Sequence, residues 1–270
     1  MDIFQQIVLG IIQGIVEWLP FSSEGILLLV KNNFFEEINL DLFIRQALFL
    51  HLGTFFAALI YFRREVGSLT RNLFHYKKAA PETKKILNFL LISTLVTGIV
   101  GLAILKLIDF LSITSFPKTS TAINLGVGCL LLVTGLFQIK ASSAGYRREY
   151  NLNNTDSLFL GFMQGIAALP GLSRSGLTVS SFLFRNIDET TALRLSFIMS
   201  LPVVLIGNLI LNSTDFIFVK EMFWGFLFSF IFGFLTIHLL MRFSKKVKFG
   251  HFVFVFGILM ILASVVNVLV

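Results

Sequence analysis

The chain of 270 residues has little charge and almost no cysteine. Only 14% of its residues are Asp, Glu, Lys or Arg, well below the share in soluble globular domains, which excludes that class of protein. Cys129 is the single cysteine, so an internal disulfide is excluded, and we expect its thiol to pack as a small core hydrophobe. No Lys or Arg precedes Lys31, so the basic region of a cleaved secretory signal is lacking. We therefore expect the N-terminal segment to remain in the mature protein.

Apolar residues take the place of the missing charge. They make up 56% of the chain, with 32 phenylalanines and a mean hydropathy of +0.85. The formal net charge is +7, but Lys and Arg are confined to short loops between apolar runs and form no stripe, so we expect no nucleic acid partner. The composition predicts an all-α polytopic protein of the cell membrane, surrounded by membrane lipids.

The apolar runs differ in whether they are continuous. Two of them, 3–30 and 157–184, are broken near their middles. The others are continuous and reach, or nearly reach, the ~20 residues that a helix needs to cross a bilayer. These six predicted transmembrane helices are 46–62, 86–108, 120–139, 194–211, 222–241 and 250–270.

The basic loops indicate how these segments are threaded through the membrane. Loops 63–85, 140–156 and 242–249 hold fourteen of the 22 Lys and Arg residues, which places them in the cytoplasm. That assignment requires each broken run to enter and leave on one side, as a re-entrant helical hairpin. Each half is then one hairpin followed by three crossings, and an odd number of crossings inverts the second half.

The predicted fold is therefore a single membrane domain, 1–270, with six transmembrane helices, two re-entrant hairpins and an inverted-topology repeat. Repeat one covers 1–139, the cytoplasmic linker 140–156, and repeat two 157–270.

A short motif occurs once in each broken run. QGIVEWLPFSSEG, from Gln13 to Gly25, returns as QGIAALPGLSRSG, from Gln164 to Gly176. Proline and serine within apolar sequence interrupt backbone hydrogen bonding, which at membrane depth is tolerated only where protein or a water-filled cavity covers it. The two motifs therefore predict a buried polar site.

Hairpins entering from opposite faces can meet near the middle of the membrane. This would bring together two polar triplets, and Gln13 and Glu17, four residues apart, share one helix face. Helix N-termini, hydroxyls and an arginine favour an anion such as phosphate, and carboxylates near it suggest a bridging divalent cation, Mg²⁺ or Ca²⁺. The triplets are Ser22, Ser23 and Glu24 in the first motif and Ser173, Arg174 and Ser175 in the second.

At these residues the sequence resembles the undecaprenyl-diphosphatases of the BacA type. The segment Gln13 to Gly25 is similar to the family signature (E/Q)xxxE followed by LPxSSxGH, and Pro170 to Thr178 matches PGxSRSxxT. The resemblance covers essentially the whole chain. It implies hydrolysis of a polyprenyl diphosphate to the monophosphate and orthophosphate, which recycles a lipid carrier.

The resemblance also implies roles for residues. It makes Ser23 the nucleophile, Glu17 with Gln13 a metal-binding or basic group, and Arg174 the grip on the diphosphate. The family usually has His where this chain has Ile26, so Glu24 or His51 could supply the general base. The SSEG variant is typical of archaeal-looking members, whose carriers are dolichol-like.

The predicted site falls into three groups. The catalytic residues are Ser23, Glu17, Glu24, Arg174 and His51; the substrate-binding residues are Gln13, Ser22, Gly25, Gly171, Ser173, Ser175 and Thr178; and the metal ligands are Glu17 and Glu24.

Other interpretations of these residues stay open. The serines favour helix N-caps and close helix packing, and His51 could be an interhelical hydrogen-bonding residue. Arg45 and Arg194, each about twenty residues beyond a motif, could extend to the membrane interface. Inverted repeats with interrupted helices are equally typical of transporters, so the alternative function is a polyprenyl-phosphate flippase or other secondary transporter. A homodimer is possible.

Overall fold

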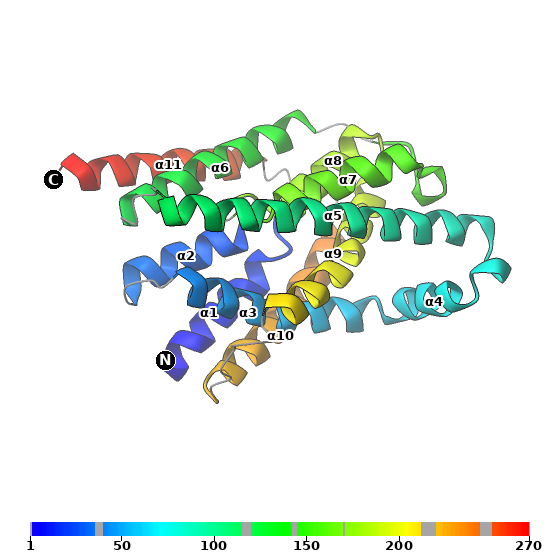
Figure 1. The fold of residues 1–270 in the computed structure, drawn as a ribbon, viewed down its shortest axis with the longest axis horizontal. Coiled ribbons are helices and arrows are strands. Elements are labelled where there is room, and N and C mark those ends of the chain that lie inside the picture. The colour runs from blue at the N-terminus through cyan, green and yellow to red at the C-terminus, as the bar shows by residue number, and fades with distance from the viewer. Residues whose placement is uncertain are drawn as a thin grey trace.

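The computed structural model describes residues 2–35, 40–114, 120–141, 145–169, 171–211, 220–243 and 250–269. In these ranges the secondary structure is helical apart from an isolated bridge between Arg147 and Ile187, so the predicted all-α class is confirmed (Figure 1). The α-helices are α1 (Ile3–Val16), α2 (Ser23–Phe34), α3 (Leu40–Tyr61), α4 (Arg63–Phe74), α5 (Pro81–Thr114), α6 (Ser120–Lys140), α7 (Asn154–Ile166), α8 (Arg174–Phe184), α9 (Glu189–Leu211), α10 (Met222–Phe243) and α11 (Gly250–Leu269).

Several helices have the length and composition of membrane spans. Over the described residues, three helices, α5, α9 and α10, contain a stretch that is long and apolar enough to cross a membrane. A fourth span results if α3 and α4 are counted together, although the chain bends by 85° between them, after Tyr61. The described apolar parts of α6 and α11 are shorter. Each of the six predicted runs coincides with one helix, and the protein is a polytopic membrane protein.

Both predicted breaks are present at the motifs. α1 ends at Val16 and α2 begins at Ser23, while α7 ends at Ile166 and α8 begins at Arg174. Ser22 and Ser173 are the N-caps of the second helices, and their Oγ atoms accept hydrogen bonds from Gly25 N at 3.1 Å and Gly176 N at 3.0 Å. The predicted capping role of these serines is therefore confirmed in both motifs.

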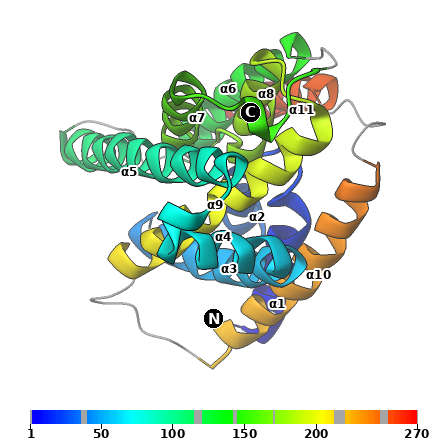
Figure 2. The same cartoon turned by 90° about the vertical axis from the view of Figure 1, so that its right-hand side faces the viewer.

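The helices pair across the two halves of the chain. α1 lies along α10, α7 along α5, and α6 along α11, while α3 contacts both α9 and α10. The α5–α7 pair lies on one side of the molecule and the α1–α10 pair on the other (Figure 2).

Glycine makes these approaches possible. A Cβ atom on Gly10 would lie 2.3 Å from the Gly225 carbonyl oxygen, and one on Gly161 would lie 2.7 Å from the Ser93 carbonyl oxygen. In lipid, where apolar surface gains little from contact with another helix, such close backbone packing is a main source of association.

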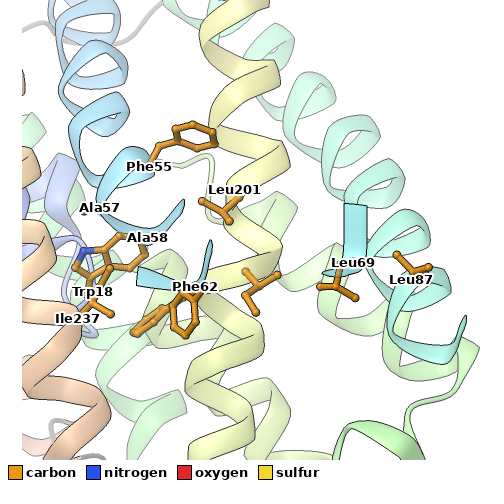
Figure 3. Close-up of a cluster of buried hydrophobic side chains, with 11 residues drawn as sticks. Trp18, Phe55, Ala57, Ala58, Phe62, Leu69, Leu87, Leu201 and Ile237 are labelled. Carbon is orange, nitrogen blue, oxygen red and sulfur yellow. The ribbon is translucent and has the colours of Figure 1, made fainter. Parts of the chain in front are cut away.

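A cluster of apolar side chains includes Trp18, which lies within the first break (Figure 3). Trp18, 2% exposed, meets Phe197 edge to face with ring centroids 4.8 Å apart, and Ala58 of α3 and Ile237 of α10 complete its surroundings. Cys129 lies on the exposed surface of α6, so the expectation of a core thiol is wrong. An exposed surface of a membrane helix faces lipid, where a small apolar side chain is equally well accommodated.

Asp156 joins the start of α7 to two arginines. Its side chain is fully buried and accepts hydrogen bonds from Arg147 Nη2 at 2.7 Å and Arg185 Nε at 2.6 Å, and it forms a reciprocal capping box with Asn153. Burial alone would raise the pKa of Asp156, but the hydrogen bonds from the two arginines outweigh it and hold the pKa below its ordinary value. This cluster fixes where the second broken run begins.

Candidate active site

A cavity of about 280 Å³ lies where the two breaks meet. One part of its wall is polar, and its residues come from both motifs and from α3: Glu17, Ser22, Ser23, Glu24, His51, Arg174 and Ser175. The remainder is mainly apolar and comes largely from α5 and α9, together with Leu48 of α3 and residues of the second hairpin such as Leu172. Gly98, Leu102, Ile206 and Ile210 belong to that part and are also exposed on the molecular surface. The cavity therefore reaches the lipid-facing side between α5 and α9.

Hydrogen bonds join the two hairpins directly. The backbone N–H of Gly171 donates to Ser22 Oγ at 3.1 Å, and Ser175 Oγ donates to the Leu19 carbonyl oxygen at 2.6 Å. Gln138 of α6 donates to the carbonyl oxygen of Pro20 at 2.8 Å. The prediction that the two motifs come together is confirmed.

Glu17 is the centre of the polar part. Its Oε2 accepts hydrogen bonds from Gln13 Nε2 at 2.8 Å and Ser23 Oγ at 2.8 Å, and lies 3.1 Å from His51 Nε2. Its Oε1 is paired with Nη2 of Arg174, 157 residues away in sequence. So many donors around one carboxylate, only 4% exposed, stabilise the ionised form.

Ser23 and Glu17 have the arrangement of a nucleophile and its base. The hydroxyl proton of Ser23 points at a carboxylate, while Ser23 also lines the cavity as the first residue of α2. Hydrogen-bond reach between the two groups is the geometric requirement for this type of activation. Ser23 is therefore equipped to attack an electrophilic centre that occupies the cavity.

Arg174, a second partner of Glu17, has an unused donor. Its Nη2 is bound to Glu17, whereas its Nη1 is buried and has no hydrogen-bond partner among the residues that the structure describes. The guanidinium carbon lies 5.8 Å from the Trp18 ring centroid, in the range of a cation–π contact. A buried, unpaired guanidinium nitrogen is costly unless a ligand oxygen completes it, so this position favours an anion.

Comparison with known proteins agrees with the geometry. The family described as Bacitracin resistance protein BacA matches residues 6–263. The chain belongs to this family.

Among curated BacA relatives are three named undecaprenyl-diphosphatase. The protein of Methanococcoides burtonii is 38% identical, over 97% of this chain and 98% of its own length. That of Sulfurisphaera tokodaii is 34% identical over 100% of both chains, and that of Haloarcula marismortui 34% over 93% of both. The resemblance to an archaeal-looking BacA member is thereby confirmed.

Four predicted residues of this BacA chain support the site from behind the cavity wall. Gly171 has φ of +109°, a backbone conformation that favours glycine. Ser173 caps α8, and a Cβ atom on Gly25 would lie 3.1 Å from the Oγ of the other cap, Ser22. Thr178 Oγ1 lies 2.6 Å from Ser196 Oγ, which ties α8 to α9. These residues fix the hairpins, and none of them lines the cavity.

Gln164 and Ser200 are among the cavity residues that were not predicted. Gln164 donates to the Met199 carbonyl oxygen at 3.3 Å, and its buried Oε1 has no partner within the described part of the chain. Ser200 also lines the cavity and is the counterpart of His51 in the second repeat, because it follows Arg194 by six residues as His51 follows Arg45. Both could have been found by carrying each candidate of one repeat to the matching position of the other. Arg194 itself forms ion pairs with Glu65 at 3.4 Å and Glu149 at 3.1 Å.

The predicted Mg²⁺ or Ca²⁺ has limited support from the protein's own ligands. Among the described residues no three His, Cys, Asp or Glu side chains are grouped to hold a metal, and both oxygens of Glu17 already accept hydrogen bonds. Glu24 lines the cavity, and no described residue donates a hydrogen bond to its carboxylate. One carboxylate together with substrate phosphates is a common arrangement for Mg²⁺. By this criterion Glu24 is the described residue best placed to hold a divalent cation.

Proposed function

We propose that this protein hydrolyses a polyprenyl diphosphate, undecaprenyl- or dolichyl-like, to the monophosphate and orthophosphate, and so recycles a lipid carrier. The observation that carries the proposal is the arrangement of Ser23, Glu17 and Arg174 at the polar end of a cavity that opens toward lipid. The names of the BacA relatives agree with this activity.

The geometry supports a definite sequence of steps. The terminal phosphorus lies in front of Ser23 Oγ, with a phosphate oxygen held by Nη1 of Arg174. Oγ attacks the phosphorus while its proton passes to Glu17 Oε2, and the bond from the terminal phosphorus to the bridging oxygen breaks, which releases the prenyl monophosphate. Glu17 gives this proton to the departing monophosphate and is ionised again when water attacks the phosphoserine. It then takes a proton from that water and returns it to Ser23 Oγ as the bond between Oγ and phosphorus breaks, so that orthophosphate leaves and Ser23 is restored. Direct attack by water in place of Ser23 would use the same acceptor and the same arginine.

A divalent cation would supply charge neutralisation between the diphosphate and the carboxylates when bound. Glu24 would hold this cation, with Glu17 as the second predicted ligand.

The tail of the substrate has a natural place in this arrangement. Gly98 and Gly207 face open space, because a Cβ atom added to either would meet nothing within 4 Å. With Leu102 and Ile206 they form an apolar wall that continues to the outer surface of α5 and α9. The first isoprene units would lie along this wall while the rest of the tail stays in the bilayer.

We also propose that α3, α5, α6, α9, α10 and α11 cross the cell membrane and that the α1–α2 and α7–α8 hairpins are re-entrant. The pairing of helices supports an inverted repeat, since the first helix of each hairpin lies along the second crossing of the opposite half: α1 on α10 and α7 on α5. Likewise the first crossings, α3 and α9, contact each other, and so do the third crossings, α6 and α11.

The same pairing of helices between inverted halves is typical of transporters, so lipid-phosphate transport is a second candidate function. Release of orthophosphate by the purified protein in detergent separates the two, because a transporter needs two compartments and cleaves nothing.

We would measure orthophosphate release from C55 and dolichyl diphosphates with and without Mg²⁺ or Ca²⁺, for wild type, Ser23→Ala and, as a control on exposed α4, Ser68→Ala. A phosphatase with a serine nucleophile requires release by wild type and Ser68→Ala and its near loss in Ser23→Ala. Folded wild type that releases no phosphate from either lipid would contradict the proposal and favour transport.

A further inference from the structure

His51 belongs to neither motif but is held at the centre of the site. It lies in α3, is 7% exposed and lines the cavity beside Glu17. In the steps proposed above it neither attacks the phosphorus nor holds a phosphate oxygen, so its position needs another explanation.

Each nitrogen of the His51 ring faces an oxygen. Nδ1 lies 2.7 Å from the Ala47 carbonyl oxygen, and Nε2 lies 3.1 Å from Glu17 Oε2. The carboxylate of Glu17 accepts hydrogen bonds, so the ring donates to it from Nε2. The two hydrogen bonds fix the plane of the imidazole and aim one of its N–H groups at Glu17.

The backbone that carries His51 is equally constrained. Ser229 of α10 donates to the Leu50 carbonyl oxygen at 2.9 Å, and a Cβ atom on Gly53 would lie 1.8 Å from Ser229 Oγ. Thr54 Oγ1 donates to the His51 carbonyl oxygen at 3.0 Å. The helix segment that carries the ring is thus packed tightly against α10, so the position of the imidazole is fixed before a substrate binds.

The two oxygens of Glu17 have separate sets of donors. Arg174 binds Oε1, whereas His51, Ser23 and Gln13 surround Oε2, the oxygen that receives the Ser23 proton. When Nη1 of Arg174 binds a phosphate oxygen, Nη2 stays on Oε1, and the donors at Oε2 hold the other carboxylate oxygen in place.

We propose that His51 is a positioning residue, which keeps Glu17 Oε2 directed at Ser23 while Arg174 engages the substrate. This inference rests on the proposed phosphatase function. It assigns His51 the donation of a hydrogen bond to Glu17 and no transfer of a proton. The consequence is a contribution to turnover and not to substrate affinity.

The test compares two replacements of His51 in the full-length protein. His51→Gln keeps an N–H donor, whereas His51→Leu removes it at similar volume. We expect His51→Leu to lower kcat by about 10- to 100-fold, the range for losing a hydrogen bond to a charged group, with KM nearly unchanged. His51→Gln should stay within about fivefold of wild type, because it restores the donor. His75→Leu, at an exposed position after α4, is the matched control.

The outcomes separate the inference from the proposed function. Loss of kcat to the same extent in Gln and Leu variants that remain monodisperse with wild-type thermal midpoints would overturn the positioning role in favour of proton transfer. Wild-type turnover in His51→Leu, or a change confined to KM, would overturn it as well. If His51→Leu does not fold, the result for His51→Gln decides, since positioning requires that variant to be active. Failure of the phosphatase function itself would appear as absence of phosphate release in wild type and in His75→Leu.

Discussion

Replacing Arg174 by lysine separates charge from geometry at the centre of the site. The arginine has two nitrogens in use or available at once, Nη2 on Glu17 and Nη1, which is buried and has no partner among the described residues. A lysine keeps the positive charge but presents it at a single atom, so it can serve Glu17 or a phosphate oxygen and not both in the planar geometry of a guanidinium.

The magnitude follows from the hydrogen bonds that each substitution removes. In Arg174→Lys one charged hydrogen bond is given up, about 1.5–3 kcal/mol, which is roughly 10- to 100-fold in kcat/KM. In Arg174→Ala the phosphate loses its donor and Glu17 loses its partner at Oε1, and removal of a preorganised donor costs about 3–4 kcal/mol, or 10²–10³-fold. The order wild type, Lys, Ala is therefore expected.

The assay is orthophosphate release from undecaprenyl diphosphate in detergent, with Arg71→Lys on the exposed face of α4 as control. Binding is followed independently by the fluorescence of Trp18, which lies against the Arg174 guanidinium, in a Trp224→Phe background. Wild-type kcat/KM in a folded Arg174→Lys variant would refute the reasoning, because a point charge would then suffice and the free Nη1 would have no role.

Three further predictions concern stability, the cation and the tail. Asp156→Asn should lower the free energy of unfolding by about 2–3 kcal/mol, less than for a fully buried pair because both arginines are partly exposed to water, and the thermal midpoint in detergent measures it. Because the pKa of Asp156 is lowered by folding, the advantage of wild type should be complete above about pH 5 and decline as the pH falls below about 4. Glu24→Gln should raise the Mg²⁺ concentration for half-maximal release about tenfold or more. Gly207→Leu should lower turnover of a C55 diphosphate about tenfold while farnesyl diphosphate is affected less, since the added side chain occupies the apolar part of the cavity.

Each of these predictions has a contrary result. Equal thermal midpoints of wild type and Asp156→Asn at pH 7 would show that the ion cluster around Asp156 does not stabilise the fold. An unchanged Mg²⁺ titration in Glu24→Gln would exclude that carboxylate as a ligand. Gly207→Leu is matched by Gly67→Leu on α4, whose added Cβ atom also meets nothing within 4 Å. Equal turnover of the C55 substrate in both variants would exclude the wall between α5 and α9 as the place of the tail.

The local features of this protein were accessible from its sequence because they depend on neighbours along the chain. Pro20 and the capping serine at Ser22 predicted the first break, and the spacing of Gln13 and Glu17 predicted that they share one helix face, where a hydrogen bond of 2.8 Å joins them. The repeat of the motif even predicted that the two breaks meet. The misplacement of Cys129 has the same origin, since hydropathy along one helix cannot distinguish a core-facing from a lipid-facing position when both are apolar.

The contacts that define the chemistry required the folded chain. Nothing near His51 in the sequence indicates that its ring reaches Glu17, and nothing near Arg174 indicates that one guanidinium nitrogen is bound and the other left unpaired. Likewise, the lipid-facing opening of the cavity exists only because α5 and α9 lie beside each other with Gly98 and Gly207 in their walls.

The sequence by itself therefore determined the membrane class, the two interrupted helices and the residue types available for phosphate chemistry, because composition, proline and helix caps act within one or two turns. Tertiary structure alone decided which donors surround Glu17 and which surface of the cavity faces lipid. Those relations are set by where helices cross, and the crossings depend on close contacts such as Gly53 with Ser229, between residues that are far apart in the chain.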